Sequence, residues 1–345
     1  MDEVAQFSSA DRRDLFTQTA ASKGIANPEV IEKDFWVCWT LRHLFRLTDL
    51  PRLIFKGGTS LSKVYGLIER FSEDVDLAFD RHQLGFEGDS DPATPGLSGK
   101  KRQRLLKQLR DEANLCIEDR LNPRLLASFA EVIGPPGRDD SAWKLKIEDA
   151  TDGTKSIAFE YPSSGLNWEG SNYIPSAVLL EIGARSDHWP SVEASVRSYA
   201  AETFPDVFAE PSCKVVVLAA VRTFWEKVTL LHSQYHRNDP RKSSRLSRHY
   251  YDTVMMARSE IKAEALAKLD LLTDVAQHKQ VFFPAAWAKY SEAEPGSLHL
   301  MPKPELETAL EKDYEQMAQM FFANPPTLKE IMTELGQLET EINDA

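Results

Sequence analysis

The chain has 345 residues, of which 42% are hydrophobic and 27% charged, so it can form one large or two modest domains of ordinary globular composition. Its formal net charge of −12 argues against a general nucleic-acid binder. The longest apolar run, 215–221, is too short to span a bilayer, the acidic first residues form no secretory signal, and the three cysteines are widely scattered. From these features we expect a cytoplasmic protein without membrane contact.

Two helices are predicted before the first strand. One covers about residues 10–22, with Ser8 or Ser9 as its N-terminal cap. The other begins at Pro28, a residue favoured at the first helical position, and repeats apolar residues at spacings of three and four.

Residues 53–65 are predicted to form a strand, a tight turn and a helix. The short apolar run 53–55 is typical of a buried strand. Four residues then form the turn and the start of the helix: Gly57, Gly58, Thr59 and Ser60. Backbone N–H groups and the helix dipole at such a turn favour an anion such as a phosphate.

A second strand is predicted over residues 71–79, where polar and apolar side chains alternate. Ser72, Asp74 and Asp76 fall on one face, and residues two apart on a strand lie about 6.5–7 Å apart. Two carboxylates so placed can reach one metal ion, and Mg²⁺ is usually held by one or two carboxylates plus substrate phosphates. The segment therefore predicts a phosphate-binding turn beside a metal site.

The sequence GGTSLSK followed by SEDVDL resembles the first motif of the DNA polymerase β-type nucleotidyltransferases. Its form resembles the AbiEii/MenT nucleotidyltransferase toxins of type IV toxin–antitoxin and abortive-infection systems, and the resemblance extends over four motifs in about residues 28–257. It implies a bilobal α+β fold. Residues 1–210 would form a polymerase β-like nucleotidyltransferase domain with a mixed sheet flanked by helices, and residues 211–345 a helical bundle.

The stretch 85–99 is rich in Gly, Pro, Ser and Asp and predicts a loop, with a substrate lid as one interpretation. A helix follows from residue 100 to about 119. Its basic half, 100–110, is either a solvated face or a contact for nucleic acid.

Residues 139–185 are predicted to form a β meander. Glu181 lies inside its most apolar strand, where a lone carboxylate is costly unless it is paired or bound to metal. The surrounding LLEIG resembles the second motif of the family, which implies that Glu181 completes the metal site. Glu160 is the rival third carboxylate, and an edge-strand Glu181 paired with Arg185 is the remaining alternative.

Beyond a proline-containing loop at 202–211, the chain is predicted to be helical to its end. A buried helix is expected over 215–232 and resembles the third motif. The resemblance implies that Lys227 contacts the nucleotide triphosphate, a task that suits a compact point charge. A surface lysine is the alternative.

Residues 243–256 resemble the fourth motif, in which a basic residue precedes an aspartate on a helix. Here Arg248 lies one turn before Asp252, where the family often has a lysine, and further basic residues occur from 237 to 248. Asp252 would act as a general base or orient the lysine of the third motif. His249 is interpreted as a helix-surface histidine rather than a catalytic one.

Taken together, the resemblance implies Mg²⁺-dependent, or Mn²⁺-dependent, transfer of a nucleoside monophosphate from an NTP to an RNA acceptor. The expected acceptor is the 3′ end of tRNA, with arrest of translation and a cognate antitoxin as partner. The implied site residues are as follows: catalytic Asp74, Asp76, Lys227 and Asp252; nucleotide-binding Gly57, Gly58, Thr59, Ser60, Ser72, Lys227 and Arg248; metal-binding Asp74, Asp76 and Glu181.

Four further interpretations stay open. The acceptor could be a protein hydroxyl, as in AMPylation, or the chain could bind nucleotides without catalysis. Phosphorylation of Ser72 by a kinase-like antitoxin would place negative charge beside the metal carboxylates, whereas a plain strand serine is the simpler reading. The segment 32–36 is interpreted as packing and capping, with Lys33 as an alternative contact to nucleotide phosphates.

Overall fold

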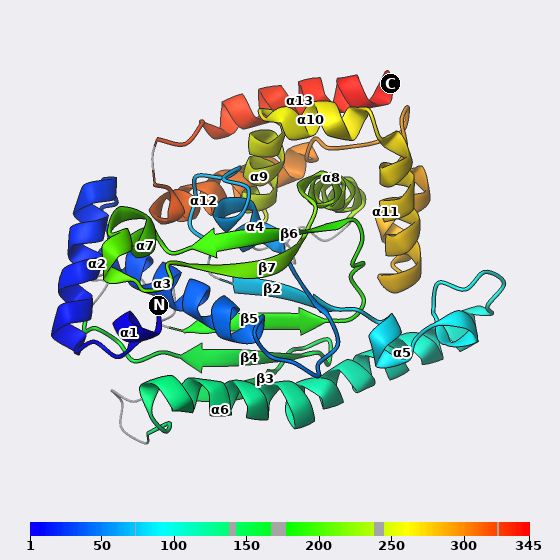
Figure 1. The fold of residues 1–345 in the computed structure, drawn as a ribbon. Coiled ribbons are helices and arrows are strands. Elements are labelled where there is room, and N and C mark those ends of the chain that lie inside the picture. Colours follow the sequence, from blue (N-terminus) through cyan, green and yellow to red (C-terminus); the bar gives the residue numbers. More distant parts are fainter. Residues whose placement is uncertain (73, 138–142, 167–176, 238–244, 323) are drawn as a thin grey trace. The chain divides into compact units, whose positions relative to one another are not determined.

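The computed structural model describes residues 1–72, 74–137, 143–166, 177–237, 245–322 and 324–345 (Figure 1). The chain divides into two compact units, each continuous in space but not in sequence. Unit 1 consists of residues 1–64, 71–91 and 103–217, and unit 2 of residues 65–70, 92–102 and 218–345. Residues 139–142 and 167–176 of the predicted meander, and residues 238–244 of the basic stretch 237–248, lie outside the described residues.

Within the described residues, unit 1 is built on a seven-stranded mixed sheet in the order β3-β4-β5-β2-β1-β7-β6. The strands are β1 (Leu53–Lys56), β2 (Asp74–Phe79), β3 (Lys144–Asp149), β4 (Lys155–Glu160), β5 (Val178–Gly183), β6 (Ser191–Arg197) and β7 (Ser212–Leu218). β2 pairs antiparallel with β1 and parallel with β5, so it occupies the centre of the sheet. The mixed α+β architecture predicted from the sequence is confirmed.

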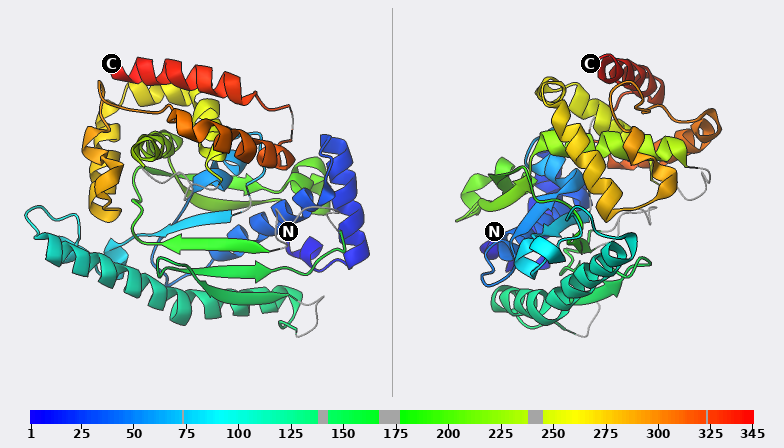
Figure 2. Two further views of the ribbon diagram at one scale, coloured as in Figure 1. Left: turned by 180° about the vertical axis from the view of Figure 1, so that it is seen from behind. Right: turned by 90° about the vertical axis from the view of Figure 1, so that its right-hand side faces the viewer.

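The helices of unit 1 flank this sheet. They are α1 (Asp2–Ala5), α2 (Ser9–Lys23), α3 (Pro28–Leu44), α4 (Gly57–Lys63), α5 (Gly99–Cys116, whose first turn belongs to unit 2), α6 (Asn122–Ile133) and α7 (Tyr199–Thr203). A π turn at Ile117–Leu121 joins α5 to α6, and Figure 2 shows them as one bent rod beside β3.

The two predicted N-terminal helices are confirmed. Ser8 caps α2 by accepting the N–H of Asp11, and Gly24 ends it in the left-handed conformation. α3 is buried along nearly its whole length, and its Trp36 packs edge-on against Phe159 of β4 at a ring-centroid distance of 5.8 Å.

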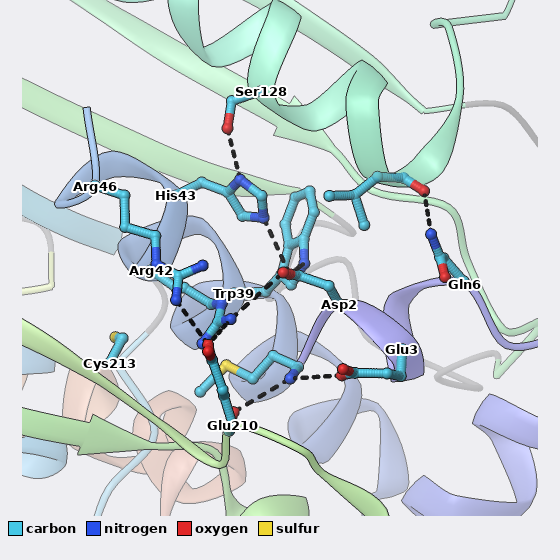
Figure 3. Close-up of polar contacts among 12 residues, drawn as sticks. Asp2, Glu3, Gln6, Trp39, Arg42, His43, Arg46, Ser128, Glu210 and Cys213 are labelled. Carbon is cyan, nitrogen blue, oxygen red and sulfur yellow. Dashed lines mark hydrogen bonds and ion pairs between the residues drawn. The ribbon is translucent and has the colours of Figure 1, made fainter. Parts of the chain in front are cut away.

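A polar network fastens α1 to α3 (Figure 3). Asp2 accepts the indole N–H of Trp39 at 3.0 Å and lies 3.2 Å from His43 Nε2. The hydrogen bond from His43 holds the pKa of the Asp2 carboxyl well below its usual range. Arg42 donates to Glu210, which ties the loop before β7 to the same helix.

The predicted helix over 215–232 is only partly correct. Residues 212–218 form β7, and the helix α8 (Ala220–His236) begins after it. β7 pairs parallel with β1, with Phe55 opposite Val217, so its β-branched run is buried in the sheet. A short continuous apolar run fits a buried strand and a buried helix equally well, which is why periodicity misassigned it.

Unit 2 is helical, as predicted for the C-terminal part of the chain. After α8 come α9 (Ser247–Ala257), α10 (Glu260–Leu266), α11 (Leu269–Phe282), α12 (Glu307–Gln316) and α13 (Leu328–Asn343). The segment 65–70 joins this unit because Phe322 N–H donates to the carbonyl of Glu69 at 3.1 Å. Among the described residues, no helix is long and apolar enough to cross a membrane.

Candidate active site

Three acids lie at neighbouring positions of β2 and β5. In the parallel register Asp76 is opposite Glu181, and Asp74 is opposite Leu179. Residues opposite one another project from the same face, and so do residues two apart on one strand. Asp74, Asp76 and Glu181 therefore share a face of the sheet, and their strands are about 4.8 Å apart. The sheet brings together the carboxylates that the sequence suggested as metal ligands.

The burial of these acids differs from the expectation in one respect. Asp74 and Asp76 are half-buried, but Glu181 is exposed although Leu180 and Ile182 beside it are buried. Side chains of β5 alternate between buried and more exposed positions, so Glu181 points towards solvent. Its carboxylate therefore loses little hydration in the folded protein. The rival acid, Glu160, lies 4.0 Å from Lys144 and is hydrogen-bonded to Lys146, so the lysines of β3 balance its charge.

Gly57 lies directly against the carboxylate of Asp76. Its φ of +75° is a conformation that other residues rarely adopt, and a Cβ built on it would come within 1.8 Å of Asp76 Oδ2. The pairing of Lys56 with Asp76 in the β1–β2 ladder explains the contact, since Gly57 is the next residue. Glycine is therefore required here twice, for its backbone conformation and for the space it leaves.

The hydroxyl groups of the turn hold α4 to β2. Thr59 Oγ1 donates to the carbonyl oxygens of Ser72 and Asp74, at 3.3 and 2.5 Å, and Ser60 Oγ donates to the Gly57 carbonyl at 2.8 Å. Both side chains are buried, whereas Gly57 and the residue after it are half-exposed. The turn can thus offer backbone N–H groups to an anion, while its hydroxyl protons are used within the fold.

In unit 2, Asp252 on α9 is fully buried between two cations. Arg70 donates to its two oxygens, from Nε at 2.7 Å and from Nη2 at 2.8 Å, and Lys227 Nζ donates to Oδ2 at 2.7 Å. Burial alone would raise the pKa of Asp252, but the charges of Arg70 and Lys227 outweigh it and hold the pKa well below its usual range. Such a carboxylate is a poor proton acceptor, but it holds the side chains of Arg70 and Lys227 in fixed positions.

Comparison with known proteins places this geometry in a family. The sequence profile described as nucleotidyl transferase AbiEii toxin, type IV TA system, matches residues 39–334. The chain belongs to the AbiEii family. It is thus a nucleotidyltransferase toxin of a type IV toxin–antitoxin system, with a nucleotide substrate and an antitoxin partner. The resemblance drawn from the first motif is confirmed.

Among solved structures, the chain is similar to MenT4, a nucleotidyltransferase toxin from Mycobacterium tuberculosis H37Rv. The two share 15% sequence identity with a TM-score of 0.42, and the alignment covers 94% of this chain and 98% of that one. A search of curated protein sequences gave no match.

For an AbiEii nucleotidyltransferase, the acid trio of Asp74, Asp76 and Glu181 offers candidate ligands for a divalent ion beside the glycine turn. Its donors are all carboxylate oxygens, which suit a hard cation. In the part of the chain that the structure describes, however, only Asp80, His82 and His188 form a group of three whose ligand atoms lie within 4.8 Å of one another. Among the described residues, none forms an ion pair with Asp76, whose carboxylate rests on Gly57.

Lys227, the lysine of the predicted third motif, is buried, so the alternative of a surface lysine is wrong. Lys227 is 7% exposed, and burial lowers its pKa against the opposing effect of Asp252. His249 is half-buried rather than on the surface. Burial, and then the charges of Lys227 and Arg248, keep the pKa of His249 well below its ordinary value, so the imidazole is neutral.

Arg70 is a site residue that sequence reasoning missed. It lies between the turn and the D-x-D strand, in a stretch without regular periodicity, and its partner is 182 positions away. Nothing local distinguishes it from a surface arginine. Only the packing of 65–70 onto the helices of unit 2 reveals its role.

The segment 32–36 has a structural role. Within it, Glu32 accepts the N–H of Ser164 at 2.7 Å, and Asp34 pairs with Lys63 at 2.7 Å. Lys33 between them is 1% exposed. This confirms the interpretation of the segment as packing and capping.

The basic half of α5 is amphipathic. Its leucines are buried, and its exposed cations are Lys100, Arg104 and Lys107.

Proposed function

We propose that this AbiEii protein transfers a nucleoside monophosphate from an NTP to an RNA acceptor, with Mg²⁺ held by Asp74, Asp76 and Glu181. The observation that supports it most is the register of β2 and β5, which places the three carboxylates on one face. The contact of Gly57 with Asp76 supports it further, because it joins the phosphate-binding turn to the metal carboxylates.

In this proposal each residue has a distinct task. The backbone of Gly57, Gly58, Thr59 and Ser60 binds the triphosphate, and Lys227 and Arg248 neutralise its charge. Mg²⁺, when bound, supplies Lewis-acid stabilisation of the attacking and leaving oxygens of an in-line displacement. The acceptor hydroxyl oxygen bonds to the α-phosphorus, its proton passes to solvent, and pyrophosphate leaves.

Asp252 is proposed as a positioning residue rather than the general base. Its oxygens already accept hydrogen bonds from Arg70 and Lys227, and its low pKa opposes proton uptake. The ammonium group of Lys227 is thereby held in one place. A fixed cation stabilises a developing phosphate charge without reorganising during the reaction.

The proposed acceptor is RNA, with the 3′ end of tRNA as the specific substrate and arrest of translation as the consequence. Its support is membership of a toxin family together with exposed cations on α5. A protein hydroxyl is the competing acceptor.

The test incubates the protein with total RNA and each α-labelled NTP in turn, with Asp76→Asn and Glu160→Gln variants beside it. Label should enter RNA of tRNA size, be removed by RNase, and disappear with Asp76→Asn but not with Glu160→Gln. Label that resists RNase and is removed by protease would indicate protein NMPylation instead. No label in either acceptor would contradict catalysis and leave a nucleotide-binding module.

We propose Ser72 as the point of control by the antitoxin. Ser72 is half-buried and lies two residues before β2, where its carbonyl accepts a hydrogen bond from the Thr59 hydroxyl. A phosphate there would add about −1.5 to −2 charges near the metal acids and weaken nucleotide binding. Intact mass of the toxin, produced with and without its antitoxin, tests the idea, and an unchanged mass refutes it.

A further inference from the structure

A second group of metal-ligating side chains lies in unit 1, at the other end of β2. Asp80 follows β2 directly, His82 begins the short helix η1 (His82–Leu84), and His188 lies between β5 and β6. One ligand atom from each lies within 4.8 Å of the other two. Asp80 comes four residues after Asp76, about 13 Å along an extended strand, so this group is separate from the acid trio.

Both imidazoles direct Nδ1 to the same carboxylate oxygen. The distance to Asp80 Oδ1 is 4.0 Å from His82 and 3.8 Å from His188, and the rings meet edge to face with centroids 5.3 Å apart. These separations are too long for hydrogen bonds. Two ligands with bonds of about 2.0–2.1 Å to one tetrahedral Zn²⁺ are roughly 3.3–3.5 Å apart, so a small contraction would suffice.

The Nδ1 atom of His188 provides an independent observation. It is closed off from solvent and forms no hydrogen bond to any part of the chain that the structure describes. The oxygens of Asp80 and Asp187 are 3.8 and 3.6 Å away from it. A buried polar atom without a partner is unfavourable. A cation bound between His188 Nδ1 and Asp80 would satisfy the nitrogen.

The charges around the group also favour a divalent cation. Three carboxylates, those of Asp80, Asp91 and Asp187, surround one guanidinium, that of Arg81. Arg81 lies 3.4 Å from Asp91 and 3.5 Å from Asp187. With neutral imidazoles, the formal charges of Asp80, Asp91, Asp187 and Arg81 sum to −2. Asp80 is the carboxylate that lies within 4.0 Å of both histidines. Asp91 is nearer to His82, at 3.3 Å, and Asp187 is nearer to His188, at 3.6 Å.

We propose that Asp80, His82 and His188 form a zinc site distinct from the catalytic metal site. Imidazole nitrogens with one carboxylate are donors that suit Zn²⁺ better than Mg²⁺, and three protein ligands leave a fourth position for water. The ion would join the end of β2 to the β5–β6 connection. It would therefore brace the same strand pair that aligns Asp76 with Glu181 at its other end.

The ligands come from segments more than a hundred residues apart, so no zinc-ligand spacing is visible in the sequence. The inference does not depend on the proposed transfer reaction, because it concerns a structural ion bound by residues outside that site.

The test uses the full chain, stripped with a chelator, dialysed against Zn²⁺ and measured for metal content by mass spectrometry. One zinc per chain is expected in the wild type and in Asp76→Asn. His82→Ala and His188→Asn should lose it, with at least tenfold weaker binding. His278→Asn, a half-exposed histidine of unit 2, is the matched control and should bind like the wild type.

Two readouts keep the test decisive. Co²⁺ should give the visible absorption of a nitrogen-ligated site in the wild type and not in His82→Ala, and Zn²⁺ should raise the melting temperature only where it binds. His82 is exposed, so its variant folds even if His188→Asn does not. A wild type that retains no zinc, or a His82→Ala variant that binds as tightly as the wild type, overturns the proposal.

Discussion

Asp76 and Asp252 are both acids of the proposed reaction, but their environments are opposite. Asp76 is half-buried on an open sheet face, opposite Glu181, and none of the described residues forms an ion pair with it. Asp252 is fully buried and neutralised by Arg70 and Lys227. In the proposed reaction, the acid that binds an exchangeable cation has no ion pair among the described residues, whereas the acid proposed to position Lys227 is neutralised within the fold.

Asp76→Asn should produce the largest loss of activity and little loss of stability. Removing one metal carboxylate removes several kcal/mol of transition-state stabilisation, so transfer should fall by about a thousandfold or more. The amide also relieves repulsion with Glu181, so the free energy of unfolding should not decrease. Initial rates of label incorporation and urea unfolding measure the two effects. The matched variant Glu160→Gln, whose acid is already paired with lysine, should stay within about threefold of the wild-type rate.

Asp252→Asn, unlike Asp76→Asn, should mainly lower the free energy of unfolding. It removes the charge of the carboxylate that Arg70 and Lys227 both bind, and breaking a buried pair costs about 3–5 kcal/mol. Urea unfolding followed by circular dichroism would measure the loss. A cost below about 1 kcal/mol would contradict the neutralised-acid interpretation. Arg70→Met combined with Asp252→Asn should be less damaging than the sum of the single changes, because the two residues share one interaction.

Gly57→Ala tests the close approach of the turn to Asp76. The new methyl group would overlap Asp76 Oδ2, so the carboxylate must move, and we expect transfer to fall by about a hundredfold. The positive φ adds about 1–2 kcal/mol of strain. Gly24→Ala is the control, since Gly24 also has positive φ but open space where the Cβ would lie. It should lose stability without losing activity once folded.

The smallest effect should appear in the pH dependence of stability. The pKa of Asp252 is lowered in the folded state, so its ion pairs stabilise the protein fully above the ordinary value of about 3.9 and lose that contribution as the pH falls below it. The free energy of unfolding should therefore fall more steeply below pH 4 in the wild type than in Asp252→Asn. The difference in slope should be roughly 1.4 kcal/mol for each pH unit, measured by urea titrations at successive pH values. Parallel slopes would show that the carboxyl is not held ionised in the fold.

Short-range sequence patterns were enough to predict several of the local structural features. The Ser8 cap of α2, the start of α3 at Pro28 and the alternation of Asp74 and Asp76 could be predicted because they depend on residues within a few positions of each other. Periodicity failed at 215–218, where a short apolar run is compatible with either regular structure and only pairing with β1 selects the strand.

What the sequence determined by itself was therefore the family, the acids of the first motif and the class of chemistry they suit. The tertiary structure alone decided that Arg70 meets Asp252 and that His188 lies near Asp80, and it placed Glu181 rather than its rival Glu160 opposite Asp76. The physical reason is that strand register and helix packing depend on how well side chains from the whole core are buried together. A short stretch of sequence does not contain that information.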